Sequence, residues 1–154
     1  MEQVSKTGWI EVICGPMFAG KSEELIRRIK RLEYAKKDTL VFKPKIDNRY
    51  SEDEIVSHSK RHTKSINIEH SSDVYKHLAK TKHVDAIVID EVQFLDDGIV
   101  DVCDDLANKG IRVIVGGLDT DFKGDPFKNV ANLLAKAEYI TKLTAICVKC
   151  GAPA

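Results

Sequence analysis

The stretch Gly15-Pro16-Met17-Phe18-Ala19-Gly20-Lys21-Ser22 decides the fold class, because it matches the phosphate-binding pattern G-x-x-x-x-G-K-[ST] in full. Its glycines let the backbone turn so that several N–H groups point at one anion at the start of a helix. Lys21 can then reach the β- and γ-phosphates of a nucleotide, and the Ser22 hydroxyl can coordinate Mg²⁺. A random chain of this length would match on the order of once in 200 tries. The stretch therefore predicts a site for ATP with Mg²⁺.

The residues on either side have the pattern that such a loop requires. Trp9–Cys14 before it is apolar enough for a strand, and the apolar residues of Leu25–Leu32 after it repeat at helical spacing. Further strands are expected at Thr39–Phe42, Ala86–Ile89, Val113–Val115 and Tyr139–Ile146. Further helices are expected around Val74–Leu78, after the capping cluster Ser71-Ser72-Asp73, and around Ile99–Ala107 and Val130–Ala137. This alternation predicts an α/β fold, a P-loop (RecA-like) mainly parallel sheet with helices on both faces.

One segment, Lys45–His70, is polar and weakly patterned. It has neither the sustained helical period nor the long apolar run of its neighbours. We expect a hairpin or a mobile loop there.

Composition places the chain among ordinary globular domains. Of its 154 residues, 43% are hydrophobic and 31% are charged, and 24 basic side chains balance 24 acidic ones. Proteins that bind nucleic acid electrostatically carry a basic excess, so we expect no nucleic-acid partner. No apolar run approaches the roughly 18–20 residues of a transmembrane helix, and Met1–Trp9 lacks the apolar stretch of a signal peptide. We expect a soluble, cytoplasmic protein with no membrane partner.

A second anchor follows the strand Ala86–Ile89, which ends in Asp90-Glu91. An Asp at this place in P-loop proteins supports Mg²⁺, which makes Ser22 and Asp90 the predicted Mg²⁺-supporting residues. Glu91 is placed to accept a proton from an attacking hydroxyl or water. The alternative without a function is an ordinary strand end with two solvated acids. Because parallel strands end at one rim of a sheet, we expect the phosphate loop to meet the polar groups after the later strands, Asp47 and Arg49, Asp90-Glu91, and Leu118-Asp119.

These signals fit any P-loop enzyme, so an acceptor pocket has to distinguish a kinase from an ATPase. Phe94, Phe122 and Phe127 lie beyond strand ends, and Met17 and Phe18 lie in the phosphate loop itself. An aromatic slot with few charges suits a flat, neutral heterocycle, whereas any single ring can equally be core. Two alternatives stay open, an ATPase in which Glu91 orients water and a nucleotide-binding module without turnover.

The chain resembles the cellular-type (type II) thymidine kinases over almost its whole length. The strings that carry the resemblance are Gly15–Ser22, Asp47–Tyr50, Asp90–Phe94, Leu118–Phe122 and Lys142–Cys150. The resemblance implies ATP-dependent phosphorylation of the 5′-hydroxyl of thymidine, and of deoxyuridine, in nucleotide salvage for DNA synthesis. It also implies a cytoplasmic homotetramer that dTTP inhibits by feedback.

By matching position, the resemblance also assigns roles to individual residues, with Glu91 as the general base. The implied contacts to ATP are Gly15, Pro16, Met17, Phe18, Ala19, Gly20, Lys21, Ser22, Asp90 and Gln93. The implied thymine pocket is formed by Met17, Phe94, Leu118, Phe122 and Phe127. Asp47 and Arg49 match a segment near the phosphates, where Arg49 could stabilise charge on the transferred group.

The pair Cys147-x-x-Cys150 is half of a four-ligand structural zinc site. The resemblance implies a second cysteine pair after a lasso-like loop that grips the base, and the sequence stops at Ala154 without it; Cys14 and Cys103 fit core positions better. We expect a P-loop kinase domain at 1–143 and, at 144–154, the first half of a zinc segment that the chain truncates. Without the lasso, ATP binding would survive while nucleoside affinity suffered.

Overall fold

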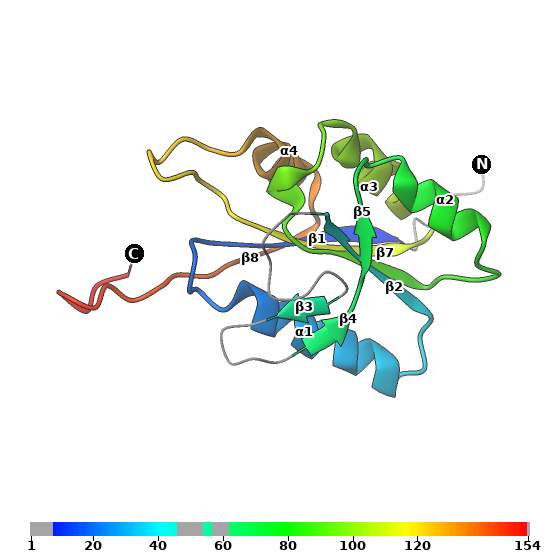
Figure 1. The fold of residues 1–154 in the computed structure, drawn as a ribbon, viewed down its shortest axis with the longest axis horizontal. Coiled ribbons are helices and arrows are strands. Elements are labelled where there is room, and N and C mark those ends of the chain that lie inside the picture. Colours follow the sequence, from blue (N-terminus) through cyan, green and yellow to red (C-terminus); the bar gives the residue numbers. More distant parts are fainter. Residues whose placement is uncertain (1–7, 46–53, 57–61, 154) are drawn as a thin grey trace, which may run out of the picture.

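The computed structural model describes residues 8–45, 54–56 and 62–153 (Figure 1). Asp47 and Arg49, the two expected phosphate contacts of the second strand end, lie outside the described residues.

Six strands form one parallel sheet in the order β5-β2-β6-β7-β1-β8. They are β1 (Trp9–Cys14), β2 (Thr39–Pro44), β5 (Ile66–Ile68), β6 (Ala86–Ile89), β7 (Arg112–Gly117) and β8 (Tyr139–Lys142). The four inner strands have neighbours on both sides, and every residue of β6 is buried. Such burial explains why the inner strands are continuous apolar runs rather than alternating ones. The sheet confirms the predicted P-loop α/β class.

Helices cover both faces of this sheet (Figure 1). On one face α1 (Lys21–Tyr34) buries Leu25, Ile26 and Ile29 against β1, β6 and β7. On the other face a larger apolar core lies under α2 (Asp73–Ala79), α3 (Gly98–Asn108) and α4 (Lys128–Lys136). Within the described part of the chain, no helix is both long enough and apolar enough to cross a membrane.

The last strand is shorter than the sequence predicts. The expected strand Tyr139–Ile146 ends at Lys142, because β8 is an edge strand with β1 as its one neighbour. The β1–β8 ladder ends at the pair Cys14–Lys142, because the chain leaves the sheet after Cys14 and enters the phosphate loop. Beyond that point β8 has no strand in the sheet to pair with.

The weakly patterned segment contains both expected and unexpected structure. Its antiparallel pair β3 (Glu54–Val56) and β4 (His62–Lys64) fits the hairpin alternative. The sequence reading missed β5, which is three residues long and joins the main sheet beside β2. A three-residue strand leaves too short a pattern for periodicity to detect.

The start of α2 also differs in detail from the expectation. Ser72 occupies the N-cap position without a side-chain cap hydrogen bond. Instead, the Asp73 carboxylate accepts hydrogen bonds from the backbone N–H groups of Glu69 and His70, at 3.1 and 3.0 Å. The predicted helix is confirmed, but a side chain of its first turn accepts hydrogen bonds from the loop that precedes it.

Candidate active site

The loop between β1 and α1 has the backbone of an anion site. Gly15, Phe18 and Gly20 have positive φ angles of 148°, 64° and 91°. Gly20 directly precedes α1, and no side-chain cap occupies this helix end. A Cβ atom built on Gly20 would meet nothing within 4 Å, so the space beside it is open. Helix N–H groups that face open space in this way suit a phosphate group.

Lys21 is the charged centre of this loop. Its Nζ donates a hydrogen bond to the Pro16 carbonyl. Burial lowers the pKa of Lys21, while the charges of Asp90 and Asp119, with a smaller effect from Glu91, act to raise it. Asp90 and Glu91 follow β6 and Asp119 follows β7, and these strands end at the same edge of the parallel sheet as β1. The structure thus brings the phosphate loop together with the ends of the third and fourth predicted strands, as sheet topology predicts.

The two acids after β6 have unusual surroundings. Asp90 is 7% exposed, and its Oδ1 accepts a hydrogen bond of 2.8 Å from the Glu91 N–H. Glu91 has φ 51° and ψ 42°, a left-handed conformation that costs an L-residue about 1–2 kcal/mol. Strain of this kind persists where the surroundings fix a residue, and it concentrates at functional sites. Phe18 of the phosphate loop shares this left-handed conformation, and Glu91 is the charged residue of this rim that has it.

The end of β7 packs directly against this acidic turn. A Cβ on Gly116 would lie 2.6 Å from Leu25 and 3.3 Å from Asp90 Oδ1, and one on Gly117 would lie 2.8 Å from Gln93 Oε1. The Gln93 carboxamide oxygen accepts a hydrogen bond of 3.2 Å from the Leu118 N–H. The two glycines are therefore required for close approach, and Gln93 fixes the turn η1 (Val92–Phe94) to the end of β7.

An ion pair at the same rim joins Asp119 to Lys142, with 3.3 Å between Oδ2 and Nζ. The Asp119 side chain is 12% exposed. Lys142 pairs with Cys14 across the β1–β8 ladder, so the ion pair links β7 and β8 beside the phosphate loop. The sequence reading placed Asp119 at the rim, but it did not identify Lys142, whose contribution depends on the register of β8.

The predicted nucleoside-pocket residues divide into two groups. Leu118 is half-buried, and Phe127 packs against the core under α2–α4 while its N–H donates to the Asp119 carbonyl at 3.0 Å. Phe122 is 94% exposed, and Met17 and Phe94 are also exposed. The fold therefore holds Leu118 and Phe127 in place, whereas Met17, Phe94 and Phe122 are exposed.

The thymidine kinase family model matches residues 8–154. The chain belongs to the thymidine kinase family. Among solved structures, the ATPase DotB of Legionella pneumophila is similar with a TM-score of 0.55 and 13% identity, over 93% of this chain and 42% of that chain. The Holliday junction branch migration motor RuvB of Thermotoga maritima is similar with a TM-score of 0.53 and 15% identity, over 92% and 39%. At these identities the likeness shows a shared P-loop fold, and the chain spans about two fifths of either protein's length.

In this thymidine kinase family chain, the C-x-x-C pair lies in a tight turn. The Cys147 N–H donates to the Ala152 carbonyl at 2.9 Å, and the Gly151 N–H donates to the Cys147 carbonyl at 2.8 Å. Backbone N–H groups of Cys150 and Lys149 lower the pKa of the Cys147 thiol, which favours the thiolate that binds metal. A structural zinc site needs four ligands, and two thiols of a C-x-x-C turn could provide two of them. The turn does not complete such a site by itself, and no catalytic step proposed below depends on zinc.

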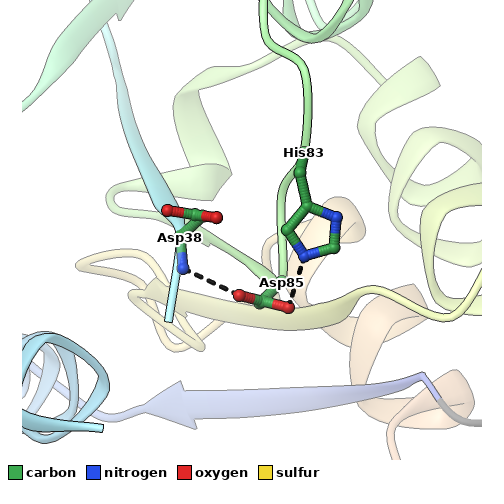
Figure 2. Close-up of side chains that lie close together, drawn as sticks. All are labelled: Asp38, His83 and Asp85. Atoms are coloured by element: carbon green, nitrogen blue, oxygen red, sulfur yellow. Dashed lines mark hydrogen bonds and ion pairs between the residues drawn. The ribbon is translucent and has the colours of Figure 1, made fainter. Parts of the chain in front are cut away.

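One other group of possible metal ligands, within the described ranges, lies at the opposite rim of the sheet. Figure 2 shows Asp38, His83 and Asp85, which lie just before β2 and β6. Asp85 accepts hydrogen bonds from the Asp38 N–H and from His83 Nε2, both at 2.8 Å. Asp38 and His83 are exposed, and hydrogen bonds among themselves account for the arrangement. We interpret this group as a surface brace between two strands of this thymidine kinase family member.

Proposed function

We propose that the chain transfers the γ-phosphoryl group of ATP to the 5′-hydroxyl of thymidine and of deoxyuridine, a step of nucleotide salvage for DNA synthesis. The observation that carries the proposal is the meeting of the phosphate loop, the buried Asp90 and the strained Glu91 at one rim, in a chain of this family. Family membership supports a nucleotide kinase, and it makes thymidine the first acceptor to test.

In the proposed mechanism, the N–H groups of Gly15–Ser22 and the Lys21 ammonium hold the β- and γ-phosphates. Mg²⁺, bound by Ser22 and Asp90, would neutralise charge on the transferred group. The nucleoside 5′-oxygen forms a bond to the γ-phosphorus, and the bond from that phosphorus to the β–γ bridging oxygen breaks, which releases ADP. Glu91 accepts the hydroxyl proton. General-base help of this kind is worth about 10²–10⁴-fold in rate.

The proposed acceptor pocket uses both groups of apolar residues. Leu118 and Phe127 form its fixed wall, because Gln93 holds the Leu118 backbone and Phe127 packs on the core. Met17, Phe94 and Phe122 are exposed and would gain contacts with a flat base. Asp47 and Arg49 are proposed to act near the phosphates, in keeping with the family resemblance.

Several features of the proposed enzyme rest on family membership. We propose a cytoplasmic homotetramer that dTTP inhibits. We also propose that 1–143 forms the kinase domain, and that 144–154 begins a zinc segment in which Cys147 and Cys150 are joined by two further ligands. A chain without those ligands would keep its nucleotide site and lose nucleoside affinity, because the lasso that they anchor in the family grips the base.

The test is ADP formation from Mg·ATP with and without thymidine, with thymidine monophosphate quantified by chromatography. We expect ADP and the monophosphate in equal amounts. A thymidine analogue without the 5′-hydroxyl should give no ADP, and Lys21→Ala should lose nucleotide affinity and rate together. Equal ADP formation with and without thymidine would instead support an ATPase. Nucleotide binding without product, in this chain and in one extended through a second cysteine pair, would leave a binding module.

A further inference from the structure

A cavity of about 530 Å³ lies between α1 and the edge strand β8, on the face of the sheet away from α2, α3 and α4. Four arginines line it, Arg27, Arg28 and Arg31 from α1 and Arg112 from the start of β7. The lining contains two carboxylates, those of Glu11 and Glu138. The volume lies within the range of small-molecule sites, roughly 300–1,000 Å³, but the wall is charged rather than apolar.

Both carboxylates are already engaged by donors of the fold. Glu11, with a side chain 7% exposed, accepts hydrogen bonds from Trp9 Nε1 at 2.8 Å, from Arg28 Nη1 at 2.8 Å and from Arg112. Burial raises its pKa, but the hydrogen bonds from Arg112 and Trp9 outweigh that effect and lower it, so Glu11 stays ionised. Glu138 Oε2 accepts the Ile10 N–H at 2.8 Å. Glu11 is thus paired with two guanidinium groups, and one oxygen of Glu138 is engaged by the backbone of β1.

The fold holds Arg28 and Arg112 in place, whereas Arg27 and Arg31 have more donors to spare, since Arg112 uses Nε and Nη2 on Glu11. Arg28 is 14% exposed and uses Nε, Nη1 and Nη2 on Glu24, Glu11 and Thr141, which makes it a rigid back wall. Arg27 uses Nε and Nη2 on Glu24 and keeps a side chain 55% exposed. Arg31 has no ionic partner among the residues that the structure describes. It follows Arg27 and Arg28 at i+4 and i+3, a spacing at which like charges repel.

We propose that this cavity binds an oxyanion of the phosphate class. Arg27 and Arg31 would hold the anion against Arg28 and Arg112. Guanidinium groups bind phosphate oxygens in pairs with defined geometry, and an anion between Arg27 and Arg31 removes their mutual repulsion. The residues of this site are separate from those of the phosphate loop, because Arg112 and Trp9 begin β7 and β1 whereas Gly15–Ser22 follows the end of β1. The site is therefore an inference independent of the proposed kinase activity.

Trp9 provides a direct reporter for the test. It is the single tryptophan of the chain, its indole donates to Glu11, and the Arg112 guanidinium lies 5.7 Å from its ring centroid. Tryptophan fluorescence would be followed while the full chain is titrated with sodium pyrophosphate at constant ionic strength. The titration would use Lys21→Ala, so that the phosphate loop does not compete. We expect a saturable change that potassium chloride at equal ionic strength does not produce.

Substitutions locate the site. Arg27→Gln with Arg31→Gln should weaken pyrophosphate binding by at least about tenfold, because two charge-assisted contacts are lost. Lys30→Gln with Lys37→Gln is the matched control, since it removes two exposed positive charges that do not line the cavity. Arg31→Lys keeps the charge and loses the paired donors, so it should give an intermediate affinity. Circular dichroism would establish that each variant is folded.

The remaining outcomes identify the ligand or overturn the site. Tighter binding of Mg²⁺-free ADP than of pyrophosphate would indicate a nucleotide as the natural ligand, and the reverse order would indicate an inorganic or small phosphate. A response that does not saturate, or that is equal in the Arg27→Gln, Arg31→Gln chain, would overturn the proposal. A response that depends on protein concentration and not on the anion would also overturn it, because a second copy of the chain would then cover the cavity.

Discussion

The two rims of the sheet carry similar charged side chains and place them in opposite conditions. At the carboxyl rim, Asp90 is buried, Glu91 has left-handed backbone, and burial lowers the pKa of Lys21. At the amino rim, His83 and Asp85 pair at the surface, and neither has a positive φ. The difference teaches that charge alone does not mark a site in this fold. Burial combined with strain does mark it, because Lys36, close to the amino rim, also has a positive φ of 56° but is exposed.

Of the substitutions that test this difference between the rims, Glu91→Gln should have the largest effect on activity. Loss of the proton acceptor should lower kcat for thymidine phosphorylation by about 10²–10⁴-fold, while ADP affinity stays the same because Gln has the same size and removes no phosphate contact. Initial rates and calorimetric ADP binding measure the two quantities. Asp85→Asn, the same kind of change at the amino rim, is the control. Near-normal turnover in Glu91→Gln would remove the assignment of the general base.

Lys142→Met tests the ion pair beside the phosphate loop. Without Lys142, the Asp119 charge is uncompensated near the nucleotide phosphates, and we expect ADP affinity to fall about fivefold, the equivalent of about 1 kcal/mol for a partly exposed pair. Adding Asp119→Asn should restore most of the affinity. Calorimetry on the four proteins of this double-mutant cycle measures the coupling. Strictly additive effects would show that the two side chains act separately.

Glu91→Gly separates the effect of backbone strain at position 91 from the effect of losing the carboxylate. Glycine adopts the left-handed conformation without a Cβ clash, so it should be more stable than Glu91→Ala by roughly 1 kcal/mol. Both variants lack the carboxylate and should lose activity to a similar extent. Urea unfolding compares their stabilities at equal loss of function. An Ala variant as stable as the Gly variant would argue against strain at this position.

Asp85→Asn, at the amino rim, should have the smallest effect, a slight change in stability. The hydrogen bond from the Asp38 N–H, then that from His83, lowers the pKa of Asp85. A lowered carboxyl pKa stabilises the fold above the usual value near pH 4, and that stabilisation disappears as pH falls through the lowered pKa. The variant should therefore unfold at slightly lower temperature at pH 7, and the gap should narrow toward pH 3. A gap that is constant with pH would mean that the charge of Asp85 contributes nothing.

The parts of the site that sequence predicted are those whose signal is local. Gly15–Ser22 carries its backbone requirement in its own residue types, and Asp90-Glu91 follows a strand whose apolar run marks its end. The common rim then follows from parallel topology, which the alternation of strands and helices already indicates.

The parts that sequence missed depend on distant partners or on backbone geometry. Lys142 reaches Asp119 only because β8 pairs with β1 in one register. The cavity lined by four arginines is formed by residues of α1 and of the start of β7, which are far apart in the sequence. Taken alone, Arg27, Arg28 and Arg31 have the pattern of a solvated helix face. Glu91 has no residue-type signal for positive φ, which favours Gly, Asn and Asp. Tertiary context imposes each of these features.

The position of β1 in the sheet has a consequence for biosynthesis. β1 lies between β7 and β8, and the Ile10 N–H finds the Glu138 carboxylate 128 residues away. The phosphate loop is likewise closed by a distant residue, because the Leu143 N–H donates to the Cys14 carbonyl at 2.8 Å and the Leu143 carbonyl lies 2.4 Å from where a Gly15 Cβ would be. On the ribosome, β1 can pair with β7 once Gly117 has been synthesised, but its other edge and the phosphate loop stay without their partners until residue 143 has been synthesised. Nucleotide binding by a nascent chain would therefore show that residues 139–143 have paired with β1 and closed the phosphate loop.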